Sequence, residues 1–575
     1  MTSESWRVPQ RRDALSYWLR TRLLSLRAWL MARWLRPAAR WPAASTLADA
    51  PVVAEHRSPL WSDGDDAEFA LVAGKVENLR VAIAAFRAVE VPADGVLSFW
   101  AQLGRPSARR GFVVGREIRE GCVVPTVAGG ICQLSNALAA VAAQAGLAFV
   151  ERHTHSARVQ AGPPTAADAT VFWRHVDLRL RAGHAWRLDV AMDANELVVS
   201  LRAHLPAAPR SVAALPPQAS RAPARGCLSC DQSECFRHAR HQGLRGQQGR
   251  TAALLDAWSP EFAGHLADRQ ADRFAPLPLR LAFWRPTSRA WTDATRLARW
   301  ASLRGALWRR RWARHSGGRR QAAVLDAQRW LAQAYAAALT PLHTRLIVDQ
   351  ALLPHLAQCG VLAGREVEVL AHSLPLGEIH ARLDRAAQQW PLDESLRDFR
   401  APPGMVAAEA QALARAHAVV TPHADVAAVL AGRNLRRLDW AMPPAQRFSV
   451  AAPLLAPLLL FPASALARKG ARELAAALQG LRCRLRVTGQ GDACAWSGIA
   501  LDTAEVADPL EGVAAVVLPA HVEHVPRILL RALACGLPVI ATPACGLASQ
   551  AGLDLVEAGD VASLRAALVK RIGDG

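Results

Sequence analysis

The sequence predicts a multidomain protein in which an α+β domain precedes an α/β region of two Rossmann-like lobes. Its 575 residues are enough for about three domains of ordinary size. Helical periodicity over 66–88 and 132–146 is followed by short β-like runs at 169–173 and 176–180. From about residue 250, short apolar runs such as 418–421 and 458–461 alternate with helix-like segments, which is the pattern of a parallel sheet.

The charge balance is strongly basic, with a formal net charge of +20. Only three of the 69 basic residues are Lys, and this Arg excess accompanies an Ala-rich composition typical of GC-rich coding. A nucleic-acid-binding protein clusters its basic residues on one face beside a recognition motif. We see no such motif beside the basic clusters of residues 1–45 and 308–320, and therefore expect no nucleic-acid partner.

Residues 1–50 are expected to hold a basic amphipathic helix over 12–36. One side carries leucines three or four residues apart, namely Leu15, Leu19, Leu23, Leu26 and Leu30. Arginines lie off this stripe, and Pro37 ends the helix. Two interpretations remain open: the helix lies on an anionic membrane surface, or it packs on the body of the protein.

The targeting and redox features indicate a cytoplasmic chain. Every apolar run is shorter than the ~18 residues of a membrane span, and Arg interrupts the early apolar stretches that a signal peptide would need. The ten Cys are mostly scattered and form no disulfide framework. We expect a cytoplasmic protein, peripheral to the inner face of the membrane if residues 12–36 bind lipid.

Residues 51–205 contain the segment with the richest chemistry. Cys132 follows Gly129-Gly130 and lies in the first turn of a predicted helix, whose N-terminus favours a thiolate. His153 and His155 follow about twenty residues later, and an imidazole is the usual base for a Cys nucleophile. The three residues predict papain-like or transglutaminase-like thiol chemistry. The alternative is a small packed Cys at a helix start.

A series of motifs in this region resembles the VanW family. It comprises Leu97-Ser98-Phe99, Arg110-Gly111-Phe112, Gly129–Ser135, Glu151–Ser156, Asp168–Val171 and Asp177-Leu178-Arg179. VanW proteins are named for an accessory gene product of vancomycin-resistance clusters. The resemblance implies a role in the cell envelope or in peptidoglycan metabolism, with an envelope glycan or its precursors as partner. Ala128 departs from the family, which often has a third Gly there, and should change turn flexibility more than chemistry.

Residues 206–249 are read as a Pro/Ala linker that ends in a compact Cys cluster. Cys227, Cys230, Cys235 and His238 place four metal-ligand side chains within twelve residues. Such a set can wrap one tetrahedral zinc ion, and three Cys with another fourth ligand can hold an iron–sulfur cluster. The sequence therefore predicts a metal site, with a reduced-thiol loop as the alternative.

The C-terminal half resembles GT-B glycosyltransferases of the group 1 type, with lobes at 250–440 and 441–575. The resemblance implies a nucleotide-sugar site built from Lys469 of the Arg-Lys-Gly run, Glu523 and Gly536. Two departures stand out. The family's second Glu falls at Arg531, and its usual Arg falls near Ser464. We expect Arg531 to meet a diphosphate, and turnover to be weak or absent.

Three functions are consistent with these features. The first is a VanW-like protein whose Cys132 performs thiol chemistry in the cell envelope. The second is a glycosyltransferase that moves a sugar from a nucleotide-sugar to an envelope glycan. The third is a non-catalytic scaffold at the membrane surface.

Overall fold

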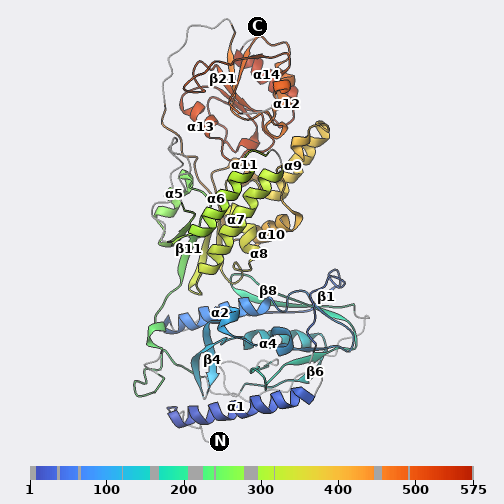
Figure 1. Ribbon diagram of the computed structural model, residues 1–575, viewed down its shortest axis with the longest axis vertical. Helices are drawn as coiled ribbons and strands as arrows, with labels where there is room; N and C mark the ends of the chain where they lie inside the picture. Colours follow the sequence, from blue (N-terminus) through green and yellow to red (C-terminus); the bar gives the residue numbers. More distant parts are fainter. Residues whose placement is uncertain are drawn as a thin grey trace. The chain divides into compact units, whose positions relative to one another are not determined.

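A computed structural model gives the fold of the chain (Figure 1). It falls into two compact units. The first holds residues 1–251 with the short segments 339–345 and 360–366, and the second holds the remainder to residue 575. The structure describes residues 8–34, 39–61, 66–119, 121–155, 168–204, 224–237, 241–277, 296–315, 318–445, 456–489 and 493–572.

The first unit is an α+β domain, as predicted, in which three small sheets accompany two core helices. An antiparallel sheet has the order β1 (Val52–Pro59), β9 (Glu196–Arg202), β8 (Trp186–Met192) and β2 (Val89–Val91). Buried and half-buried positions alternate along β8 and β9, because one face of the sheet packs on the core. The core helices are α2 (Phe69–Ile83) and α4 (Cys132–Gln144).

Two further sheets carry the segments around α4. One has the order β10 (Arg225–Gly226), β5 (Cys122–Val127) and β4 (Val114–Arg119). The other has the order β3 (Val96–Ser98), β7 (Arg179–Arg181) and β6 (Ala148–Glu151), and α3 (Phe99–Leu103) follows β3.

The strands predicted over 169–173 and 176–180 are largely wrong. Isolated bridges join Thr170 to His153 and Phe172 to Val176, and a regular strand begins only at Arg179. The cause is a tight turn in which Arg174 adopts a φ of +78°, so the chain doubles back on itself instead of extending. The turn keeps residues 168–172 next to α4.

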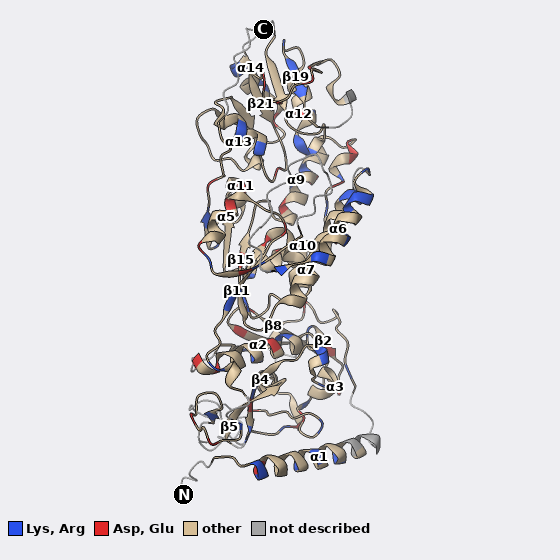
Figure 2. Ribbon diagram, turned by 60° about the vertical axis from the view of Figure 1, so that its left-hand side comes forward, with Lys and Arg blue, Asp and Glu red and all other residues tan. Residues whose placement is uncertain are grey.

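The N-terminal helix α1 runs over Arg11–Trp34, close to the predicted 12–36, and Pro37 lies outside the described residues. In Figure 2 the basic residues of this helix are coloured blue. The Tyr17 ring packs on the first unit, 6.4 Å from the ring of Phe172 and 4.7 Å below the Arg119 guanidinium. Among the described residues, no helix is both long and apolar enough to cross a membrane.

The second unit contains two α/β sheets, which confirms the predicted two-lobed region. The first sheet has the order β13 (Arg296–Leu297), β12 (Ala271–Ala275), β11 (Arg250–Leu254), β14 (His343–Asp349), β15 (Glu366–Leu370), β16 (Ala418–Thr421) and β17 (Leu435–Arg437). Its helices are α5 (Pro260–Ala267), α6 (Arg299–Trp312), α7 (Gly318–Ala338), α8 (Leu353–Gln358), α9 (Leu376–Gln389), α10 (Pro403–Arg415) and α11 (Ala424–Val429).

The second sheet is parallel at every described pairing. Its order is β20 (Ala500–Leu501), β19 (Arg484–Val487), β18 (Leu458–Phe461), β21 (Ala515–Leu518), β22 (Val539–Ala541) and β23 (Leu553–Leu555). The helices α12 (Ala471–Leu478), α13 (Arg527–Ala534) and α14 (Val561–Ile572) accompany it. Strands β18, β21 and β22 are buried along their length, as expected when helices cover both faces of a parallel sheet.

Candidate functional site

The start of α4 is held against its neighbours by close backbone contacts. A Cβ atom at Gly130 would lie 2.2 Å from the Cγ atom of Lys75, and one at Gly129 would lie 2.7 Å from the backbone nitrogen of Arg116. Only glycine permits this approach. Ala128, the departure noted above, has a φ of +65°, a conformation that is uncommon for a residue with a side chain. The turn therefore fixes where Cys132 begins the helix.

His155 and Asp168 complete a constellation around the Cys132 thiol. The His155 imidazole lies near enough to the thiol for each group to shift the pKa of the other, and its Nδ1 atom pairs with Oδ1 of Asp168. The other carboxylate oxygen, Oδ2, accepts the backbone N–H of His155 at 2.9 Å. Because Asp168 holds Nδ1, the Nε2 atom is left for the sulfur.

Helix α4 also positions the segment that carries Asp168. The Ser135 hydroxyl donates to the carbonyl of Ala169 at 2.6 Å, and the Asn136 side chain accepts the Ala169 N–H at 2.8 Å. The Cys132 thiol lies 3.7 Å from the carbonyl oxygen of Val171 and 3.8 Å from the Thr170 hydroxyl. One helix turn thus orients both the thiol and the loop that faces it.

The electrostatics favour a thiolate–imidazolium pair. Burial raises the pKa of Cys132, but the hydrogen bond and positive charge of His155 outweigh burial and lower it below that of an ordinary thiol. Burial lowers the pKa of His155, but hydrogen bonds to Asp168 and Cys132 and their negative charges raise it to about 10. These shifts favour the form in which the sulfur is a nucleophilic thiolate and His155 holds a proton beside it.

His153, the second predicted imidazole, has a different environment. Its ring is half exposed, and Nε2 lies 3.3 Å from the Glu151 carboxylate. The same Glu151 oxygen accepts the backbone N–H of Asp177 at 3.0 Å, and Arg179 contacts the other oxygen at 3.3 Å. Of the two candidate bases, the structure brings His155 to Cys132 and ties His153 to a surface ion-pair network.

The predicted metal site falls partly outside the described residues, because His238 is not among them. Burial, followed by the nearby thiols of Cys230, Cys235 and Cys122, raises the pKa of Cys227 to about 11. Across the described ranges, no group of three or more His, Cys, Asp or Glu side chains is placed to hold a metal ion. A zinc or iron–sulfur site at this cluster stays a prediction.

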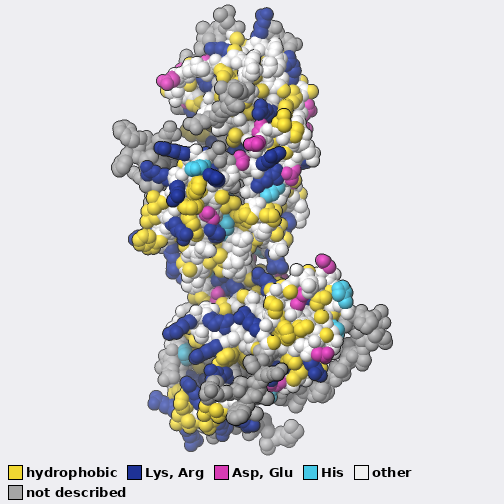
Figure 3. All heavy atoms as spheres, turned by 45° about the vertical axis from the view of Figure 1, so that its right-hand side comes forward, with side chains coloured by type: hydrophobic (Ala, Val, Ile, Leu, Met, Phe, Trp, Pro, Cys, Tyr) yellow, Lys and Arg dark blue, Asp and Glu magenta, His cyan; other side chains and the backbone are white. Residues whose placement is uncertain are grey.

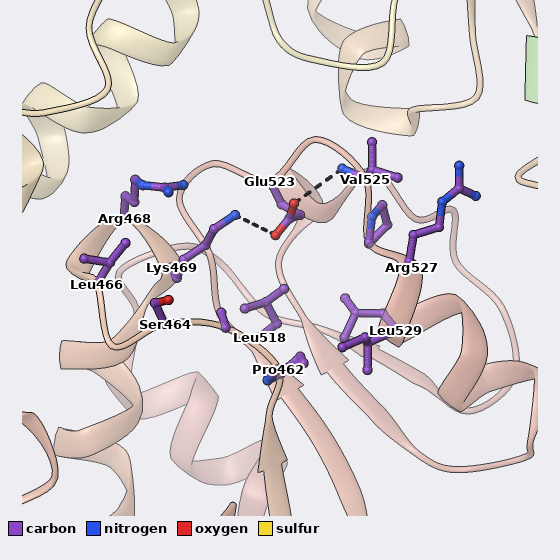
Figure 4. A pocket seen from close by; sticks show the side chains of 13 residues that line it. Pro462, Ser464, Leu466, Arg468, Lys469, Leu518, Glu523, Val525, Arg527 and Leu529 are labelled. Carbon is purple, nitrogen blue, oxygen red and sulfur yellow. Dashed lines mark hydrogen bonds and ion pairs between the residues drawn. The ribbon is translucent and has the colours of Figure 1, made fainter. Parts of the chain in front are cut away.

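A pocket of about 300 Å³ opens in the last lobe of the second unit (Figure 4). It is lined by residues that follow β18, by the end of β21 and by the first residues of α13. Parallel α/β sheets bind ligands at these carboxyl ends.

Lys469 and Glu523 point toward one another inside this pocket, with 2.6 Å between Nζ and Oε2. The other oxygen of Glu523 accepts the backbone N–H groups of His524 and Val525 at 2.9 and 3.3 Å. Arg468 also lines the pocket and lies over the Phe399 ring at 4.6 Å. Arg527 lines the pocket too, so the site carries three cations and one carboxylate whose oxygens already have partners.

Two other residues expected to meet the donor do not line this pocket, and their roles stay predictions. Arg531 is not a lining residue, because its guanidinium pairs with Asp508 instead of facing the pocket. Gly536 does not line the pocket either; it follows α13 with a φ of +76° and serves to end that helix.

Comparison with protein families matches two parts of the chain. Residues 74–202 match the model described as VanW like protein, and residues 456–574 match Glycosyl transferases group 1. The chain combines a VanW domain with a group 1 glycosyltransferase domain. No curated protein matches the chain. Cys132, His155 and Asp168 all fall inside the VanW domain, and the Lys469–Glu523 pair falls inside the glycosyltransferase domain.

Solved structures show remote similarity over about half of the chain. Sucrose-phosphate synthase from Thermosynechococcus elongatus is 15% identical with a TM-score of 0.36, covering 56% of this chain and 89% of that one. The lipopolysaccharide outer core galactosyltransferase WaaB is 13% identical with a TM-score of 0.32, covering 56% and 90%. These similarities are too remote to support an argument about activity.

Within the VanW domain, the residue that sequence reasoning missed is Asp168. It was visible as part of the Asp-Ala-Thr-Val motif, but nothing in its spacing indicated that it would meet His155. The signal was chemical: a Cys–His pair needs a third group to orient the imidazole, and a motif Asp in the same domain could supply it.

Proposed function

We propose that the VanW domain is a cysteine-dependent acyl-transfer enzyme, with Cys132 as nucleophile, His155 as acid and base, and Asp168 as the residue that orients His155. The observation that carries this proposal is the single constellation of thiol, imidazole and carboxylate at the start of α4. The sulfur attacks an amide carbonyl and forms a C–S bond. The C–N bond breaks, and the amine leaves with the proton from His155.

The second half of the reaction regenerates the thiolate. Water or an amine attacks the thioester, the C–S bond breaks, and His155 takes up the proton that the attacking group releases. Water gives hydrolysis, and an amine gives transpeptidation. Asp168 stabilises the imidazolium in both halves, because its carboxylate lies against Nδ1.

The proposed substrate class is peptidoglycan or its precursors, which the VanW resemblance implies. Peptidoglycan and its precursors carry amide-linked peptides on a glycan, which gives a thiol nucleophile a suitable carbonyl. The first test is the rate at which iodoacetamide alkylates Cys132 compared with Cys359, an exposed thiol of the same chain. The proposal requires a reactive Cys132 thiolate at neutral pH. The decisive measurement is therefore the alkylation rate of Cys132 as a function of pH.

A second candidate function is nucleotide-sugar binding by the glycosyltransferase domain. It is favoured by the pocket in which Lys469 and Arg468 lie at the carboxyl end of β18, where a sugar diphosphate would meet positive charge. A diphosphate must compete with Glu523 for Lys469, because the two are already paired. We therefore expect weak binding and little transfer of a sugar to an envelope glycan.

Calorimetry with uridine and guanosine diphosphate sugars tests this second function. The Lys469→Met variant should lose about tenfold or more in affinity, since a buried cation facing the phosphates is removed. Lys570→Met is the matched control, because Lys570 is exposed and pairs with Asp554 in the same lobe. Equal affinities of the Lys469→Met variant and the wild-type chain would contradict the assignment, and rapid sugar transfer would contradict the expected weak turnover.

A further inference from the structure

Among the described residues, nothing covers the most apolar side of helix α1. Leu15, Leu19, Leu23, Leu26 and Leu30 are between 46% and 65% exposed, and Trp18 is 50% exposed. The spacing of four, four, three and four residues puts these leucines on one side of the helix. Figure 3 shows yellow side chains of this kind gathered with dark blue ones at the lower edge of the first unit.

The opposite side of α1 is the one that packs on the domain. Its half-buried residues are Ala14, Tyr17, Thr21, Ser25 and Ala28. They are small or, for Tyr17, anchored by Arg119 and Phe172. The helix can therefore pack on the body of the protein and still expose its leucines for another partner. The small-residue side packs on the domain, and the leucine stripe stays exposed.

The positive charge of α1 indicates which kind of partner the leucine stripe binds. The helix carries six arginines and a single acidic residue, Asp13. Arg11, Arg12, Arg20, Arg22 and Arg27 are all exposed, and the Arg22 guanidinium lies 5.2 Å from the centre of the Trp18 ring. Exposed leucines with Trp and Arg on one helix match the apolar boundary and the anionic headgroups of a lipid surface.

We infer that α1 is an interfacial helix that docks the VanW domain on an anionic lipid surface through this leucine stripe. Docking would bring the thiol site to the membrane. Tyr17 of α1 contacts Phe172. Val171, which precedes Phe172, contacts the Cys132 thiol through its carbonyl oxygen. The substrate of the proposed acyl transfer would then be held in the membrane, as a lipid-linked precursor is; this consequence alone rests on the proposed function.

Co-sedimentation of the full chain with vesicles tests the docking. Vesicles rich in phosphatidylglycerol should bind it, vesicles of phosphatidylcholine should bind much less, and raised salt should weaken attachment. The triple variant Leu19→Gln, Leu23→Gln, Leu26→Gln should lose about tenfold or more in vesicle affinity, since its stripe no longer enters the interface. The matched control replaces Leu392, Leu501 and Leu555, exposed leucines outside α1, with Gln and should bind as the wild type does.

Two results would overturn the inference. One is equal binding of the α1 triple variant and the wild-type chain to phosphatidylglycerol vesicles. The other is a wild-type chain that ignores vesicles but self-associates in sedimentation velocity until the stripe is replaced, which would make the stripe an interface between copies. The Cys132→Ser variant should bind vesicles normally. Failure of the acyl-transfer proposal would therefore leave the docking result unaffected.

Discussion

Replacing His155 with Ala should reduce the rate of Cys132 alkylation at pH 7 by about a hundredfold or more, the usual scale of a positioned acid–base group. The imidazole both holds the proton beside the sulfur and lowers the pKa of Cys132. Without it, burial dominates, and burial raises the pKa of that thiol. The measurement is quantitative mass spectrometry of the Cys132 peptide after timed exposure to iodoacetamide.

His153→Ala is the control that the chain itself supplies. The two histidines are two residues apart, but the ring of His153 is half exposed and pairs with Glu151. Its removal should leave the alkylation rate of Cys132 within about twofold of the wild-type rate, as is usual for a surface substitution of small energetic effect. Equal losses in the two variants would show that the segment around residues 151–155, not the His155 imidazole, controls the thiol.

Asp168→Asn should give the second large effect, with Cys132 reactivity at pH 7 falling by about a hundredfold. The amide keeps the size of the carboxylate but removes the negative charge that, with the hydrogen bond, raises the pKa of His155 to about 10. The imidazole then loses its proton near its ordinary pKa, and the thiol loses its cationic partner.

The Asp168→Asn variant should also change how the Cys132 alkylation rate depends on pH. Its alkylation rate should recover as pH rises toward the pKa of an ordinary thiol, because a thiolate then forms without help from His155. Asp189→Asn, which removes a carboxylate bound to Arg187 and Arg202 in the same unit, should leave the profile unchanged. A rate that stays low at every pH would mean that Asp168 supports the fold, not the charge state of the pair.

The sequence predicted much of the fold, and the reason is visible in particular elements. Runs such as 418–421 and 458–461 coincide with β16 and β18, because strands of a parallel sheet buried on both faces are short and continuously apolar. The start of α4 at Cys132 was also predictable, since Gly-Gly followed by helical periodicity marks a helix N-terminus. These features are local and need no knowledge of distant contacts.

The features that the sequence left open depend on distant contacts. Arg531 lies in the expected helix, but Asp508, 23 residues earlier, takes its guanidinium away from the pocket. The choice between His153 and His155 depends on two carboxylates: Glu151 pairs with His153, and Asp168 pairs with His155. Whether the α1 leucines are buried or exposed depends on which side of the helix packs on the domain. The sequence has leucines on one side and small residues on the other, and either side could pack.

The ionisation of Cys132 tests the central claim most directly. The full-length wild-type chain is alkylated over a range of pH, and the Cys132 and Cys359 peptides are quantified in the same sample. Cys359 serves as the internal reference: it is exposed, its surroundings partly desolvate it and so raise its pKa, and it has no His155 beside it. Cys132 should react rapidly at pH 7 and hold a plateau until His155 titrates near pH 10. A Cys132 rate that climbs with pH alongside that of Cys359, with no plateau near neutrality, would contradict the thiolate–imidazolium pair and the acyl-transfer function built on it.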